Sequence, residues 1–163
     1  MATKMISSLF GEFEYAAEEV YRFEHGLPGF PEEREFMFMK IEDSPFTVLH
    51  SIREDLYFFL IDPFPLFPDY EVTIPDPVLE ELGIQDRNSV LCYCIVVLRE
   101  PLADSTVNLL APVIMNTVNR KGMQLVLENS SYSVRQPLFS HQGNKEYNDR
   151  KKGAAGRSEA AGQ

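Results

Sequence analysis

The sequence has no tryptophan and only two cysteines among its 163 residues, Cys92 and Cys94. Two thiols are too few for the disulfide framework of a small secreted domain, so we expect a reducing compartment. Long apolar runs are also missing, because residues 56–61 and 90–98 fall far short of the roughly 20 residues that cross a bilayer. Residues 1–10 lack the apolar stretch behind a basic head that marks a secretion signal. These absences exclude a membrane-spanning helix and favour a cytoplasmic protein.

Sequence patterns for catalysis are absent as well. No serine lies in a G-x-S-x-G elbow, and no glycine-rich loop is present to hold a phosphate. The histidines His25, His50 and His141 are scattered, and a structural zinc needs four ligands. We therefore expect no catalytic residue, no cofactor and no metal, although a barrel that binds a small molecule or acts as an enzyme remains the alternative.

Positive charge is scarce in most of the chain. Residues 1–100 carry 7 Lys+Arg against 20 Asp+Glu, a net charge of −13, whereas residues 101–163 carry 8 against 5. A negative field repels phosphate backbones and attracts basic proteins, so direct binding of nucleic acid is not expected. Solubility alone is the other reading of this charge.

The chain is long enough for one domain, and its apolar residues recur in short runs typical of strands. Turn-forming residues separate these runs, so the pattern predicts an antiparallel barrel or sandwich. The expected strands cover residues 20–23, 34–40, 46–52, 56–61, 70–74, 90–98, 106–111 and 123–127.

One short helix interrupts the strands. Asp76 is a good N-cap, Pro77 suits the first helical position and Gly83 can end the helix in the left-handed conformation. We expect two turns that cover one open end of the sheet.

The sequence changes character near Ser140. Residues 141–163 are rich in Gly, Ala, Asn, Gln and charge, with Tyr147 as the only large apolar side chain. Such a segment cannot offset its ordering entropy by burial. We therefore expect one domain at residues 1–140 and a disordered tail at 141–163 that is dispensable for folding.

Cys92 and Cys94 lie on one face of an expected strand, where they could pack in the core or begin a metal site, and core packing is favoured. His50 lies in another strand and is expected to be partly buried.

The Pro-rich loop, residues 62–70 (DPFPLFPDY), holds rigid aromatic side chains beside carboxylates. Proline stops strand pairing, so Phe64, Leu66 and Phe67 can stand out from the sheet as a protein-docking surface. Alternatively they fold back to cap the core, and the residues do not decide between the two.

Four sequence blocks resemble the FliW family of flagellar assembly factors. They are FGEF at residues 10–13, FxxGLPGF at 23–30, LIDPF at 60–64 with PDY at 68–70, and NLLAP at 108–112 with Asn116 and GMQ at 122–124. Their order and spacing fit the family from about residue 5 to residue 139.

The resemblance implies a compact, mostly antiparallel β-barrel and a non-enzymatic cytoplasmic regulator. Proteins of this kind bind newly made flagellin and, when flagellin is scarce, the RNA-binding translational repressor CsrA, which then releases the flagellin message. The repressor would be contacted away from its RNA surface, and a monomer is expected. The residues that we expect to contact a partner are Phe64, Leu66, Phe67, Asp69, Tyr70, Glu71 and Asn116.

Two further expectations concern single residues. At least one of Gly26 and Gly29 should have positive φ in a turn, because Pro28 presets such a turn. Asn108 is expected to be a buried hydrogen-bond anchor, whereas Asn116 is expected to be the better partner contact.

Overall fold

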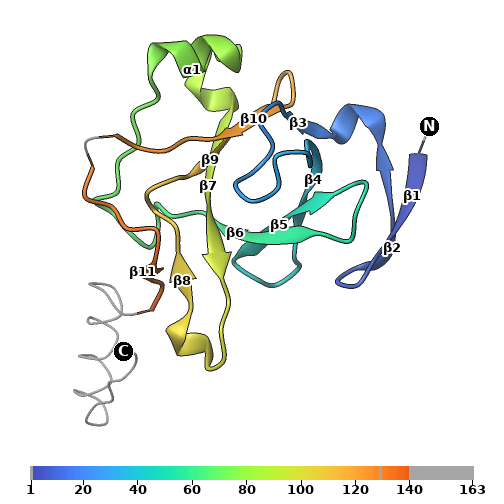
Figure 1. The fold of residues 1–163 in the computed structure, drawn as a ribbon, viewed down its shortest axis with the longest axis horizontal. Helices are drawn as coiled ribbons and strands as arrows, with labels where there is room; N and C mark the ends of the chain where they lie inside the picture. Colours follow the sequence, from blue (N-terminus) through green and yellow to red (C-terminus); the bar gives the residue numbers. More distant parts are fainter. Residues whose placement is uncertain (1, 129, 140–163) are drawn as a thin grey trace.

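A computed structural model describes residues 2–128 and 130–139. The predicted disordered tail at 141–163, and with it the boundary at residue 140, lies outside the described residues. The chain is mainly β, as predicted, with one short α-helix (Figure 1).

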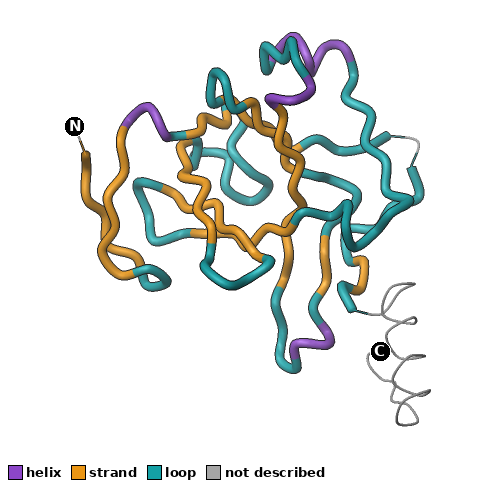
Figure 2. Tube along the Cα trace, turned by 180° about the vertical axis from the view of Figure 1, so that it is seen from behind, coloured by secondary structure: helices purple, strands orange, loops and turns teal. Residues whose placement is uncertain are grey.

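Seven strands close into a barrel (Figures 1 and 2). Neighbours pair in the order β7–β6–β5–β4–β3–β10–β9, and a further pairing between β7 and β9 closes the ring. All pairs are antiparallel except β10 with β3, which is parallel, so the predicted, mostly antiparallel barrel is confirmed. The bounds are β3 Tyr21–Phe23, β4 Glu35–Lys40, β5 Phe46–Ser51, β6 Tyr57–Ile61, β7 Val90–Val97, β9 Val113–Asn116 and β10 Lys121–Gln124.

Strand β7 is long enough to pair with two different strands along one edge, β9 in the barrel and β8 (Thr106–Val107) outside it. Its first half pairs with β9 inside the barrel, and its last two residues pair with β8 outside it. Strand β11 (Gln136–Pro137) extends this outer ladder. The β7–β8 hairpin therefore projects below the barrel in Figure 1.

Three of the expected strands differ from the structure. Residues 70–74 belong to no strand, and only Thr106–Val107 of the segment 106–111 is paired. The third expected strand, 123–127, begins two residues early as β10 and ends at Gln124, after which the chain turns onto the outside of the barrel.

Strands β1 (Ala2–Ser7), β2 (Gly11–Ala16), β9 and β11 were not among the expected strands. Strands β1 and β2 form a separate two-stranded hairpin beside the barrel (Figure 1).

The alternation of side chains along the strands builds two cores. The inner core fills the barrel, with Phe23, Phe36, Leu49 and Leu60 fully buried. The outer core lies between the outside of β7 and the loops around residues 62–84 and 125–139. Because β7 contributes to both, both of its faces are apolar, which explains the unbroken apolar run that the sequence has there.

Helix α1 (Asp76–Glu81) begins one residue earlier than predicted. Pro75 is the N-cap and Asp76 the first helical residue, so the predicted side-chain cap is not made. The C-terminal end is as expected, because Gly83 has φ +64° and its N–H donates to the carbonyl of Glu80. Ile84 N–H donates to the carbonyl of Leu79, which completes a Schellman motif.

The N-terminal hairpin is held to the barrel through His50, which is fully buried rather than partly buried. Its Nε2 lies 2.8 Å from Ser7 Oγ, and its Nδ1 lies 2.7 Å from the carbonyl oxygen of Ser51. Phe13 meets the imidazole edge-on at 5.3 Å. The contacts that bury His50 come from both sheets, which explains why the sequence of β5 alone does not predict its burial.

Within the described part of the chain, no helix is long and apolar enough to cross a membrane.

Candidate protein-docking surface

The Pro-rich loop lies over the outer core, and its backbone forms two successive turns. The N–H groups of Leu66 and Phe67 both donate to the carbonyl of Pro63, and Tyr70 N–H donates to the carbonyl of Phe67. The Asp62 carboxylate accepts from Phe64 N–H at 3.2 Å. With its prolines, this bonding presets the loop conformation, so little ordering entropy opposes binding.

Tyr70 fixes the end of this loop. Its side chain is 4% exposed, and its hydroxyl donates to the carbonyl of Leu109 at 2.8 Å. Tyr132 packs edge-on against the Tyr70 ring at 4.8 Å. Burial raises the pKa of the Tyr70 hydroxyl, and the neighbouring Cys94 raises it further. Tyr70 therefore supports the loop from below and is not a surface contact, which corrects its assignment as a partner-binding residue.

The two alternatives for the aromatic side chains are both realised, each by different residues. Phe64 and Leu66 stand out, at 42% and 37% exposure, with Asp69 and Glu71 exposed nearby. Phe67 folds back, half-buried against the outer core. The candidate docking surface is therefore defined as Phe64, Leu66, Asp69 and Glu71.

A groove of about 680 Å³ lies beside Phe64. Its floor is the outer face of β7 and β9, and its walls are the segment after the Pro-rich loop and the chain that follows α1. Most of its lining residues are apolar, and an open apolar groove is a candidate site for a protein partner. The lining residues are Phe64, Val72, Thr73, Ile74, Leu79, Ile84, Gln85, Asp86, Arg87, Val90, Cys92 and Ile114.

Sequence reasoning missed most of this groove. Val72 and Ile74 were read as part of a paired strand, and Val90 and Cys92 as core. The one available signal was the apolar alternation on both sides of the Pro-rich loop, which predicts burial without revealing which apolar side chains stay half-exposed.

The two thiols are poor nucleophiles in this environment. Cys94 is fully buried and Cys92 half-buried, so core packing is confirmed for the first and incomplete for the second. Burial raises the pKa of each thiol to about 12, and the Asp62 carboxylate contributes to both shifts. No group of three or more His, Cys, Asp or Glu in the described residues is placed to hold a metal.

We therefore expect slow alkylation of both cysteines in the folded protein. At pH 8 the thiolate fraction of a thiol with a pKa of about 12 is on the order of one in ten thousand. Iodoacetamide labelling followed by mass spectrometry should show both cysteines modified at least tenfold more slowly than in urea. Rapid labelling of Cys92 alone would mean that the groove leaves its sulfur solvated.

Both asparagines are hydrogen-bond anchors, which agrees with the prediction for Asn108 and differs from the prediction for Asn116. Asn116 is 1% exposed, and its Nδ2 donates to the carbonyls of Leu82 and Gly83 at the end of α1. Asn108 is only half-buried, although its Oδ1 accepts from the N–H groups of Leu110 and Ala111. Asn116 is thus a structural anchor, and its assignment as a partner-binding residue is wrong.

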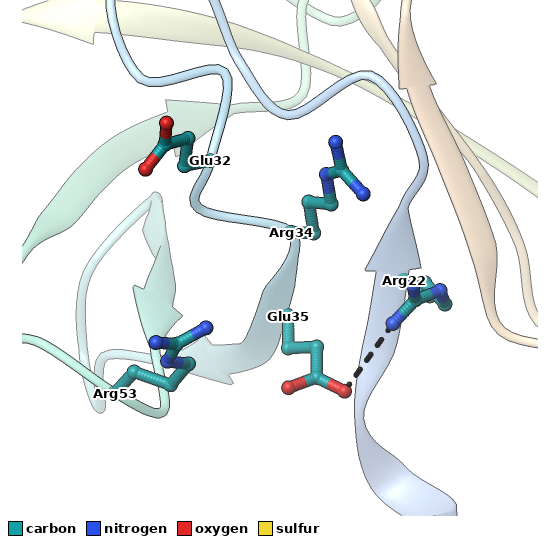
Figure 3. A pocket seen from close by; sticks show the side chains of 5 residues that line it. All are labelled: Arg22, Glu32, Arg34, Glu35 and Arg53. Atoms are coloured by element: carbon teal, nitrogen blue, oxygen red, sulfur yellow. Dashed lines mark hydrogen bonds and ion pairs between the residues drawn. The ribbon is translucent and has the colours of Figure 1, made fainter.

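A second hollow carries mixed charge on the opposite wall of the barrel (Figure 3). Arg22 bridges Glu35 at 3.5 Å and Glu24 at 3.0 Å, and Arg34 and Arg53 line the same hollow. Exposed pairs of this kind contribute about 0–1 kcal/mol each. Its charges of both signs partly neutralise one another, so it is a weaker candidate than the Phe64 surface.

Comparison with known proteins identifies the family. The profile described as FliW protein matches residues 4–138. The chain belongs to the FliW family. It is 39% identical over 137 residues to "Flagellar assembly factor FliW" of Geobacillus thermodenitrificans, covering 83% of this chain and 95% of that protein. It is 41% identical over 139 residues to the protein of the same name from Desulfitobacterium hafniense, covering 84% and 91%.

The fold agrees with a solved FliW structure. The crystal structure of the flagellar assembly factor FliW superposes with a TM-score of 0.80 at 37% identity, covering 85% of this chain and 98% of that one. The resemblance read from the four sequence blocks is therefore confirmed. The barrel interior of this FliW-family chain is filled by aromatic and aliphatic side chains, which favours an interaction protein over a barrel that encloses a ligand.

Proposed function

We propose that this FliW-family chain is a non-enzymatic, cytoplasmic flagellar assembly factor and translational regulator. It binds flagellin and, when flagellin is scarce, binds the repressor CsrA and relieves repression of flagellin translation. The names of its relatives, flagellar assembly factors at 39–41% identity, support the first part. The filled barrel and the acidic composition support a protein-binding role in which nucleic acid is not the partner. We propose that the chain acts as a monomer away from membranes.

The observation that carries this proposal is the exposed, preset docking surface. Phe64 stands out from a loop whose backbone is fixed by its own turns, and Asp69 and Glu71 lie exposed at its end. A rigid aromatic anchor among carboxylates fits a basic protein partner, because the aromatic ring supplies contact area and the carboxylates steer association.

Switching between two partners has an energetic requirement. Flagellin must displace CsrA through an overlapping surface or through a coupling free energy, typically 1 to 3 kcal/mol or about 5- to 150-fold in affinity. Titration calorimetry with the purified proteins tests this. We expect each partner to bind alone and flagellin to weaken CsrA binding at least fivefold. Failure to bind either protein would overturn the proposed function.

The first prediction at this surface concerns its aromatic anchor. Replacing Phe64 by alanine should weaken binding of CsrA or flagellin by about 1–3 kcal/mol, because exposed aromatic anchors dominate such interfaces. Phe30→Ala is the matched control, because Phe30 is 40% exposed against 42% for Phe64 but lies on another loop. Equal loss of affinity in the two variants would move the site away from the Pro-rich loop.

The second prediction concerns electrostatic steering. Reversing Asp69 and Glu71 to lysine should slow association with CsrA most strongly at low ionic strength and leave dissociation nearly unchanged. Reversal of Glu12 and Glu14 on β2 changes the net charge equally, with the same spacing and exposure. Stopped-flow rates measured against salt concentration should separate the two variants, and identical rates would argue for a diffuse charge effect.

A further inference from the structure

Residues 71–74 have the properties of a strand but no strand partner. Val72, Thr73 and Ile74 are all β-branched, and burial alternates along the segment, with Val72 and Ile74 packed against the outer core and Thr73 exposed. In the described structure the segment nevertheless belongs to no sheet. In Figure 1 it descends from α1 toward the Pro-rich loop along one side of the barrel.

Its backbone is correspondingly unpaired. Glu71 N–H donates to the Tyr132 hydroxyl at 3.0 Å, which holds one end in place. The N–H groups of Val72, Thr73 and Ile74 have no hydrogen-bond partner among the described residues. In an extended segment successive N–H groups point to opposite edges, so each edge of this segment offers unpaired backbone groups as a template for pairing with another chain.

Open space lies on both sides of this row. The apolar groove described above runs along one side, and a third hollow of about 360 Å³, which Glu71, Thr73 and Tyr132 help to line, lies on the other. Thr73 lines both, so the segment forms the ridge between them. A chain laid into the apolar groove would run beside the unpaired backbone and place alternate side chains over Val90 and Cys92 on the groove floor.

The charges around this ridge favour a basic binding partner. Asp86 and Arg87 line the groove, Glu71 lines the hollow on the other side of the ridge, and Asp69 and Asp76 are exposed within five residues of Thr73 in the chain. A basic segment with alternating apolar side chains matches both the apolar floor and the acidic rim.

We propose that residues 71–74 accept an added β-strand from the basic protein partner, with the apolar side chains of that strand in the groove beside Phe64. This inference rests on the proposed function, since it specifies how the basic partner, the CsrA repressor, is held. Backbone pairing supplies affinity, and the groove supplies preference for alternating apolar side chains.

Amide hydrogen exchange on the full chain tests the proposal with purified CsrA as the probe. In the free protein the amides of Val72, Thr73 and Ile74 should exchange rapidly, because nothing in the described structure pairs them. An added strand pairs on one edge only, so saturating CsrA should slow exchange at least tenfold at the amides on that edge, either Thr73 or Val72 together with Ile74. Binding of CsrA without this protection would overturn the strand proposal and leave the proposed function standing, whereas absence of binding would overturn both.

A pair of variants gives an independent readout. Thr73→Pro removes one backbone N–H at an exposed position and should weaken CsrA binding at least tenfold. Thr73→Val keeps the N–H and the strand-forming shape, so its affinity should stay within twofold of the parent. Equal affinity of the two variants would contradict backbone pairing. If Thr73→Pro does not fold, protection in the parent protein still decides.

Discussion

Replacing Gly26 by alanine is expected to lower the free energy of unfolding by about 3 kcal/mol. Gly26 has φ +65°, a conformation that costs an L-residue roughly 1–2 kcal/mol. An added Cβ would also lie 2.6 Å from the carbonyl oxygen of Phe30 and from backbone atoms of Pro31. Backbone cannot move aside cheaply, so overpacking adds about 1–3 kcal/mol to the conformational term.

Gly29 in the same turn is the matched control. It has φ +85°, but an added Cβ would meet no atom within 4 Å. Gly29→Ala should therefore show the conformational cost alone, about 1–2 kcal/mol. Urea unfolding of both variants measures the difference, and equal destabilisation would show that the turn relaxes around Gly26.

This turn was predictable because its signal is local. The sequence GLPG has a proline that suits the second position of a turn and glycines that can adopt positive φ. The structure confirms positive φ at both Gly26 and Gly29. The barrel strands other than β9 were predicted for a related reason, since β-branched and aromatic runs between turns are also local signals. Closure by the parallel seam of β10 and β3 is a long-range pairing that no local pattern reveals.

The unpaired segment at 71–74 marks where local signals mislead. Its residues favour a strand, and its side chains alternate as strand residues do, yet whether a strand finds a partner depends on neighbouring chain elements. Strand β6 ends before Pro63, and the Pro-rich loop turns away over the outer core, so no strand of the described residues pairs with this segment. The sequence therefore predicted the strand propensity of residues 71–74 correctly, but it wrongly predicted that they pair in a sheet.

The candidate site was predicted in part for a similar reason. Composition placed rigid aromatics and carboxylates in residues 62–71, and Phe64, Leu66, Asp69 and Glu71 are exposed there. Which aromatic ring faces outward depends on the turn at Pro63 and on the space over Cys94, which Tyr70 occupies. Such packing depends on residues distant in the sequence. The sequence of the Pro-rich loop therefore could not distinguish the aromatic side chains that are buried under the loop from those that are exposed.

The largest misjudgement, at Asn116, leads to the largest expected loss of stability. Asn116→Asp should lower the free energy of unfolding by about 4 kcal/mol at pH 7. The amide Nδ2 donates to the carbonyls of Leu82 and Gly83 at 2.8 and 3.2 Å, and the side chain is 1% exposed. A carboxylate can only accept hydrogen bonds, so both bonds to α1 would be lost. The Leu82 carbonyl would keep only the bond from Asn119 Nδ2, the Gly83 carbonyl would lose its donor, and a buried charge would have the Val118 N–H as its one donor among the described residues.

The loss at Asn116→Asp should depend on pH in a defined direction. Burial against two carbonyl oxygens raises the pKa of the new carboxyl in the folded state above its unfolded value of about 3.9. The folded state then binds the proton more tightly, so the destabilisation is smallest below about pH 4 and grows as the pH rises through the folded-state pKa. Urea unfolding between pH 3 and pH 8, compared with the parent protein, measures this trend.

Asn119→Asp is the control, because Asn119 donates to the same Leu82 carbonyl from an exposed position. This substitution should lower the free energy of unfolding by less than about 1 kcal/mol. A loss at Asn116→Asp that did not grow with pH would mean that water reaches the end of α1 and solvates the new charge.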